Sequence, residues 1–89
     1  MMYPYMTLAD KTEIVHSQII EDNGKQKVIV HFERPAEQGF ITARCKLPEY
    51  KWIFKEGYSA EEIAMFEQFL HSNTYLLYKY AANGRIYIT

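Results

Sequence analysis

Residues 11–34, KTEIVHSQIIEDNGKQKVIVHFER, decide the fold because two runs rich in β-branched residues flank the dipeptide Asn23-Gly24. An Asn-Gly pair between such runs is the strongest short-range signal for a two-residue β-hairpin turn, since both central positions of that turn need a positive φ. The sequence therefore predicts two antiparallel strands joined at this dipeptide.

The turn also predicts which side chains share a face of the hairpin. If Asn23 and Gly24 are the two loop residues, an apolar face forms from opposed pairs of side chains. These pairs are Val15 with Phe32, Ser17 with Val30, and Ile19 with Val28. The other face is then of mixed polarity.

On that mixed face the same register places His16 opposite His31. Neutral imidazole is the commonest ligand for zinc, and Gln18 or Glu33 on the same face could complete a ligand shell. The alternative is that the two rings stack without a metal. If the rings are close, mutual repulsion of their protonated forms predicts sensitivity to acid.

The segments that flank the hairpin extend the sheet. Residues 40–47, FITARCKL, alternate in polarity and predict a third strand with Cys45 on its core face. Pro48 ends this strand, because proline cannot donate to a strand ladder. Residues 49–58 are either a further short strand or a loop anchored by Trp52. Residues 1–10 contain Pro4 and predict an extended arm that packs on the sheet or on another subunit.

A helical region is predicted over residues 59–83. Ser59 followed three residues later by Glu62 is a capping box, which is typical of a helix start. Apolar residues then follow at near-helical spacing: Ile63, Phe66, Phe69, Leu70, Leu76, Leu77 and Tyr80. The polar residues 71–74 leave open whether this is one helix or two. Residues 83 and 84, Asn-Gly, are typical of a helix end, and residues 85–89 form either an edge strand or a tail.

Together these segments predict a single α+β domain over residues 1–89. We expect two layers: an antiparallel meander of three to four strands over residues 12–47, and a C-terminal helix or helix pair packed on one face.

Composition limits the possible functions. The 89 residues include ten basic and eleven acidic side chains, so the chain lacks the strong positive charge of a dedicated nucleic-acid binder. The single cysteine cannot form an internal disulfide, and no apolar run approaches the roughly 20 residues that span a membrane. We therefore expect a cytoplasmic protein without membrane contact. Because no catalytic or cofactor-binding motif is visible, we expect neither an enzyme nor a cofactor.

Aromatic side chains make up 16% of the sequence, and eight of them are tyrosines, which are enriched where proteins contact one another. The candidates for partner binding are Tyr3, Tyr5, Tyr75, Tyr78, Lys79 and Arg85. The candidates for nucleic-acid binding are Arg34, Arg44, Lys46 and Lys51, on the polar face of the predicted sheet.

The order of hairpin, third strand and helix resembles the HicB-type antitoxin domain. The residues that carry the resemblance are Leu47, Pro48, Gly57, Ser59, Glu61 and Glu62. The chain also resembles small proteins of bacterial and phage genomes. The second resemblance implies no activity by itself. We expect an accessory protein of the antitoxin or anti-defence kind.

The function that these features predict is a non-catalytic protein-interaction module, acting on a partner protein or as a homodimer. A nucleic-acid-binding module that uses the basic residues and tyrosines is the alternative. A small metal-dependent enzyme at His16 and His31 is the third possibility.

Overall fold

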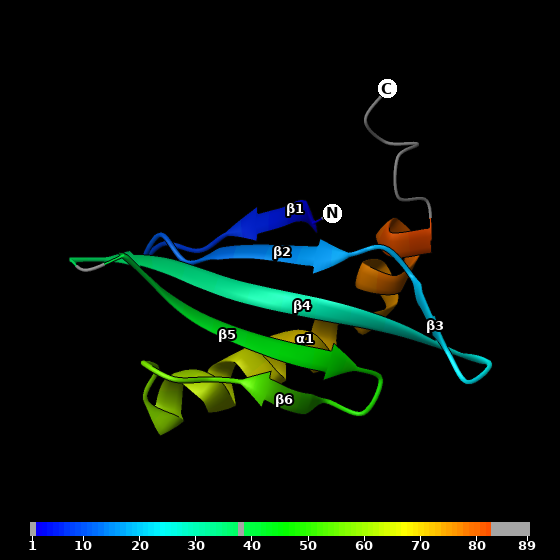
Figure 1. Ribbon diagram of the computed structural model, residues 1–89. Helices are drawn as coiled ribbons and strands as arrows, with labels where there is room; N and C mark the ends of the chain where they lie inside the picture. The colour runs from blue at the N-terminus through cyan, green and yellow to red at the C-terminus, as the bar shows by residue number, and fades with distance from the viewer. Residues whose placement is uncertain (1, 38, 83–89) are drawn as a thin grey trace.

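A computed structural model of the chain describes residues 2–37 and 39–82. Its elements are β1 (Met2–Thr7), β2 (Glu13–Ser17), β3 (Ile20–Asp22), β4 (Lys25–Ala36), β5 (Gly39–Leu47), β6 (Lys51–Phe54) and α1 (Ala60–Ala82). The strands form one open antiparallel sheet in the order β1-β2-β4-β5-β6, and β3 also pairs with β4. The helix lies across one face of this sheet (Figure 1). The α+β class is thus confirmed, while the sheet has six strands rather than three or four.

The additional strands have three origins. The N-terminal segment, expected to be an extended arm, pairs with β2 as β1. The first strand of the predicted hairpin is divided into β2 and β3. The segment around Trp52, which the sequence left open, forms β6 on the edge of the sheet next to β5. Local sequence patterns predicted too few strands, because short strands gain their stability from the neighbouring strands with which they pair.

The hairpin turn forms as predicted. Asn23 and Gly24 both have positive φ, at 53° and 77°, and Ile20 lies opposite Lys27 just beyond them. Further from the turn the predicted register is wrong: Phe32 pairs with Ile14 rather than with Val15. Between the two paired regions, the β2–β3 side holds one residue more than β4, which is a β-bulge.

Ser17 provides the hydrogen bonds of this bulge. Its hydroxyl accepts the backbone N–H of Ile29 at 3.0 Å and donates to the carbonyl of Gln18 at 2.7 Å. The side chain therefore replaces a ladder partner that the extra residue displaces. Because strand side chains alternate, the one-residue shift exchanges the two faces of β2. Ile14 and His16 point into the core, and Val15 lies on the other face.

The core lies between the sheet and α1. Phe32 of β4 is fully buried and stacks on Phe66 of α1, with ring centroids 4.2 Å apart. The predicted core face of β5 is confirmed, since Ala43, Cys45 and Leu47 are fully buried. The remaining buried apolar side chains of this cluster are Ile14, Val28, Val30, Ile63, Leu70, Leu77 and Ala81. The opposite face of the sheet has no helix over it among the described residues (Figure 1).

One continuous helix runs through the polar residues 71–74. It begins with the predicted capping box, in which the Glu62 N–H donates to Ser59 Oγ and the Ser59 N–H donates to Glu62 Oε1. The predicted helix end at residues 83 and 84, and the possible strand at 85–89, lie outside the described residues. No helix in the described part of the chain combines the length and apolar character that a membrane crossing requires.

Candidate binding surfaces

The two candidate metal ligands, His16 and His31, lie on opposite faces of the sheet, so their predicted pairing is wrong. The shifted register places His16 opposite Val30, and His31 opposite Val15. His16 is 1% exposed on the helix side, whereas His31 is half-buried on the open side. Within residues 2–37 and 39–82, no group of three or more His, Cys, Asp or Glu side chains is arranged to hold a metal ion.

His16 joins the N-terminal strand to the core. Its Nδ1 donates to the carbonyl of Ser17 at 2.8 Å, which leaves Nε2 as an acceptor with no hydrogen-bond partner among the described residues. The ring helps to line a hollow of about 310 Å³ together with Pro4, Tyr5 and Tyr80. His16 therefore packs as part of the fold.

The N-terminal tyrosines face the protein's own interior. Tyr3 is 4% exposed and packs against His16, with ring centroids 5.8 Å apart. The Tyr5 hydroxyl donates to Asn73 Oδ1 at 2.6 Å, and its ring meets Phe69 edge-on. Tyr3 therefore packs β1 on β2, and Tyr5 attaches β1 to α1. A partner does not meet Tyr3 without rearrangement of this strand.

Cys45 is a core residue, as its position on β5 predicted. Its side chain is fully buried, and burial, assisted by the nearby charge of Glu67, raises the pKa of the thiol to about 12. The thiolate is the reactive form of cysteine, so this residue is chemically inert at neutral pH.

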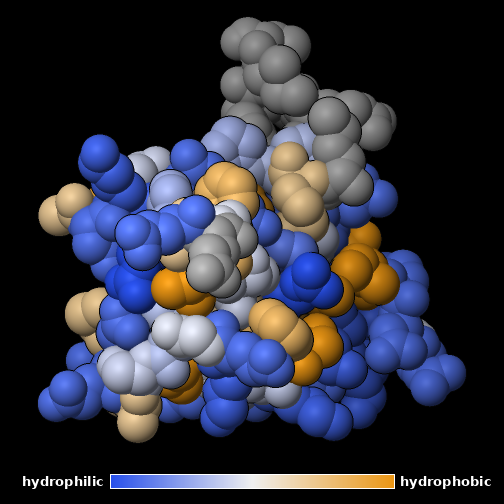
Figure 2. Space-filling view, turned by 60° about the vertical axis from the view of Figure 1, so that its left-hand side comes forward, coloured by the Kyte–Doolittle hydropathy of each residue, from blue (hydrophilic) through white to orange (hydrophobic). Residues whose placement is uncertain are grey.

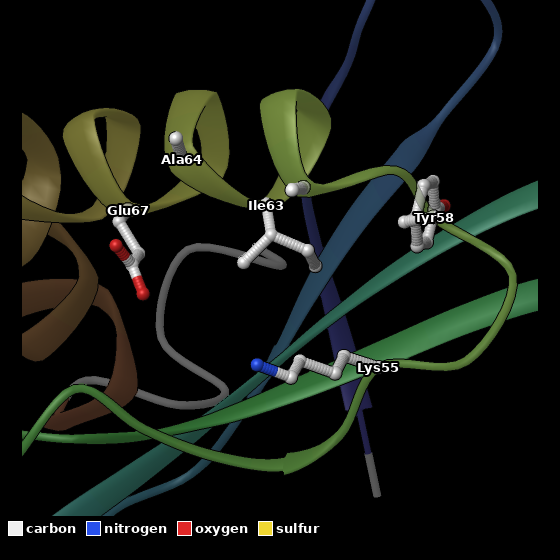
Figure 3. Close-up of a pocket in the computed structure, with 6 residues that line it drawn as sticks. Lys55, Tyr58, Ile63, Ala64 and Glu67 are labelled. Atoms are coloured by element: carbon white, nitrogen blue, oxygen red, sulfur yellow. The ribbon is translucent and has the colours of Figure 1, made fainter.

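A hollow of about 350 Å³ lies between the start of α1 and the segment after β6. Lys55 and Glu67 extend toward it from opposite sides, and Tyr58 and Ile63 form part of its wall (Figure 3). Glu67 Oε2 already accepts the indole N–H of Trp52 at 2.7 Å. This hydrogen bond holds the Trp52 ring against α1, and we assign the carboxylate no chemical step.

Three basic side chains lie together on the open face of the sheet and are here called the basic strip: Arg44, Lys46 and Lys51. Lys46 and Lys51 are direct cross-strand partners on β5 and β6. Arg44 lies opposite Phe54, with its guanidinium carbon 5.9 Å from the ring centroid. Three of the four predicted nucleic-acid candidates are thus brought together.

Arg34, the fourth candidate, lies elsewhere and is neutralised by acids. Its guanidinium donates to Glu62 at 2.6 Å and to Asp10 at 3.1 Å, and it lies 4.9 Å from the centroid of the Tyr58 ring. These contacts lower the pKa of both carboxyl groups; a backbone N–H from Thr12 is the largest cause at Asp10, and the Arg34 hydrogen bond at Glu62. Arg34 therefore ties the β1–β2 loop to the start of the helix.

His31 borders the basic strip. It pairs with Arg44 across β4 and β5, and its Nδ1 lies 3.6 Å from Glu33 Oε2. Burial first, and the positive charge of Arg44 second, lower the pKa of His31 below its usual value, while Glu33 partly opposes this shift. The ring is thus favoured in its neutral form beside the cations.

The candidates for partner binding on α1 lie in two different environments. Tyr78 is half-buried, and its hydroxyl donates to the carbonyl of Gln26 at 3.1 Å. Tyr75 is 76% exposed, and Lys79 is also exposed. Arg85 lies outside the described residues. Leu76 and Tyr80, expected on the core side, are each 38% exposed, because the core side of α1 follows Leu70, Leu77 and Ala81 instead.

Exposed apolar side chains occur on both layers of the molecule. The largest exposed fractions are those of Tyr75, Phe40, Ile53, Met65, Met6 and Phe54. In Figure 2 apolar side chains form separate patches among hydrophilic ones. The sequence reasoning missed Phe54 and Ile53 because their side of the sheet depends on a bulge between β5 and β6, which no local signal indicates.

No protein family model matches the chain, and no curated protein and no solved structure matches it.

Proposed function

We propose that the protein is a non-catalytic interaction module whose open sheet face binds an acidic segment of a partner protein. The observation that carries this proposal is the basic strip, in which Lys46 and Lys51 face each other across two strands beside Arg44. Like charges placed directly opposite each other in a sheet are destabilising. An anionic partner removes that cost, so the arrangement is one that binding would relieve.

Apolar side chains border these cations. Phe54 is 42% exposed opposite Arg44, and Ile53 is 51% exposed next to it. Aromatic and arginine side chains at the centre of an interface contribute most of the binding energy, while lysines contribute mainly to the rate of encounter. A segment that combines acidic and apolar side chains would use both features.

The accessory role, of the antitoxin or anti-defence kind, is part of the same proposal. It draws on the resemblance carried by residues 47–62 and on the chemical inertness of Cys45. A small binding protein of this kind needs a surface and no catalytic group.

The test uses a charge-reversal variant, Lys46→Glu with Lys51→Glu, and a matched control, Lys11→Glu with Lys25→Glu, which changes two exposed lysines elsewhere. Tagged wild-type protein and both variants are incubated with lysate of the native host, and captured proteins are quantified by mass spectrometry. We expect a partner that is retained by the wild type and the control and lost by the strip variant. Equal capture by all three folded proteins would contradict the proposal.

A second candidate, nucleic-acid binding, is favoured by the neighbouring aromatic rings. Phe54 beside Arg44 and Phe40, which is 69% exposed, could stack bases while the cations contact phosphates. Fluorescence anisotropy with labelled single-stranded DNA and RNA tests this idea. Binding that weakens steeply with salt and is reduced by Phe54→Ala supports nucleic acid. The absence of binding at low salt excludes it.

A further inference from the structure

We propose that two copies of the chain pair through the outer side of α1, with their helices antiparallel. This surface faces away from the sheet (Figure 1), so the inference goes beyond the proposed function and does not depend on the basic strip. The occupant of the surface is a second copy of the same chain.

The outer side of α1 has an unusual distribution of charge. Between Glu61 in the first turn and Lys79 in the last turn, no exposed position of the helix is Asp, Glu, Lys or Arg. A helix side that faces only water is normally rich in charged residues. Here the uncharged region includes Tyr75 at 76% and Met65 at 51% exposure.

The residues of this side follow the spacing of a coiled-coil seam. Steps of four and three residues alternate along one stripe, here called the outer stripe: Glu61, Met65, Gln68, Ser72, Tyr75 and Lys79. All six side chains are exposed. Glu61 and Lys79 are 18 residues apart, which is about five turns of helix and about 27 Å, so they lie on the same side of α1.

The outer stripe is complementary to itself when reversed. In an antiparallel pair related by a two-fold axis between Gln68 and Ser72, each Glu61 lies level with the partner copy's residue 79, a lysine. Both ends of the pair then carry an attractive contact between opposite charges. A parallel pair would instead bring like charges together at each end, so the charges select the antiparallel arrangement.

The inner layers of such a pair are also compatible. Met65 lies level with residue 75 of the other copy, and a methionine sulfur packs favourably on a tyrosine ring. Gln68 lies level with residue 72, a serine, so the centre can form hydrogen bonds. A polar layer inside a helix pair is a known means of fixing its register.

The expected dimer is weak, because a single helix pair of this length buries less surface than a standard protein interface. Its population should therefore depend on concentration. Sedimentation equilibrium of the full chain, from low micromolar to millimolar concentration, measures this dependence. A chain that remains monomeric over the whole range overturns the proposal.

The antiparallel arrangement is tested by charge reversal. The Glu61→Lys chain carries a cation at both ends of the outer stripe, and the Lys79→Glu chain carries an anion at both ends. Each variant alone is expected to associate about tenfold more weakly than the wild type, since two attractive contacts become repulsive. An equimolar mixture of the two should recover dimers, because every end contact is then attractive again.

The mixture separates pairing from helix stability. Glu61 and Lys79 also favour their own helix through its dipole, so both variants lose some stability as monomers. Mixing does not restore that loss, and only an intermolecular contact explains recovered association. A mixture that associates no better than its components contradicts the antiparallel pair.

A control pair, Glu21→Lys and Lys25→Glu, reverses exposed charges near the hairpin turn and should leave association unchanged. Loss of dimers in the outer-stripe variants with full partner capture would separate this inference from the proposed function. Loss of partner capture in the Lys46 and Lys51 variant with intact dimers would show that the basic strip binds the partner independently of the outer stripe.

Discussion

The two halves of the long hairpin are held in different ways. Near the turn, β3 pairs with β4 through Ile20, Glu21 and Asp22, all of which are exposed. Far from the turn, β2 pairs with β4 through residues such as Ile14 and His16, which are 1% exposed. The turn sets the register of the first half, and core packing sets that of the second.

The difference shows which effect prevails when local and long-range preferences disagree. Continuing the register of the turn would have placed Ile14 on the open face and Val15 in the core. The bulge at Ser17 leaves one position unpaired but buries Ile14, in place of Val15, beside Phe32 in the core. The extra methylene group of isoleucine contributes about 0.8 kcal/mol of burial. The Ser17 hydroxyl accepts the Ile29 N–H, so the bulge avoids most of the loss of about 1 kcal/mol for one ladder hydrogen bond.

The largest effect is expected in the half that core packing determines. Phe32→Ala removes a fully buried ring that stacks on Phe66 and should lower the free energy of unfolding by about 3–5 kcal/mol. Ile20 lies in the half set by the turn and is 36% exposed. Ile20→Ala should lower the free energy of unfolding by no more than about 0.5 kcal/mol. Urea denaturation followed by Trp52 fluorescence measures both.

Because Phe32→Ala could leave the chain unfolded, Phe32→Leu serves as a milder variant that keeps most of the volume. Its loss in free energy of unfolding should fall between the losses of Phe32→Ala and Ile20→Ala. Equal losses from the Phe32 and Ile20 variants would mean that the two halves do not differ.

A smaller effect is expected at the junction of the halves. Ser17→Ala removes the hydroxyl that accepts the Ile29 N–H and should lower the free energy of unfolding by about 1–2 kcal/mol. Gln18→Ala, at the exposed neighbouring position, is the control and should change little. Hydrogen exchange of the Ile29 amide adds a local measurement. If Ser17→Ala leaves both quantities unchanged, the hydroxyl does not hold the bulge.

Local signals predicted much of the fold. Asn23-Gly24, the alternation of residues 40–47 and the capping box at Ser59 each depend on neighbouring residues, and each was confirmed. The bulge at Ser17 was not predictable in this way, because it depends on contact with a helix more than 40 residues later in the chain. The continuity of α1 through residues 71–74 likewise depends on tertiary support, including the Thr74 hydroxyl that links Leu70 and Tyr50.

The candidate surfaces could be predicted in part from the sequence. Alternation along β5 placed Arg44 and Lys46 on one face, and only the pairing with β6 added Lys51 and Phe54. The outer stripe of α1 was present in the sequence as alternating four- and three-residue steps, but the larger apolar residues on the core side dominated the helical pattern. Which side of a helix remains exposed becomes clear only once the core has been assigned.

The smallest effect concerns His31 on the open face, from which the shifted register removes His16. Burial and the adjacent Arg44 lower the pKa of His31 in the folded chain, so the unfolded chain binds a proton more readily. The stability that the neutral ring contributes is complete above the unfolded pKa of about 6.5 and is lost as the pH falls from there through the folded pKa. Urea denaturation at pH 7.5 and 5.5 should show lower stability at the lower pH.

His31→Gln should reduce this difference, and Arg44→Gln, which removes the second cause of the shift, should reduce it less. The chosen window lies above the titration of Asp10, Glu49 and Glu62, whose pKa values are lowered and whose contributions are lost only in stronger acid. In the register that the turn alone would impose, the opposed His16 would have added its repulsion to that of Arg44 as the pH fell. A difference that Arg44→Gln leaves unchanged would mean that Arg44 does not contribute to the shift at His31.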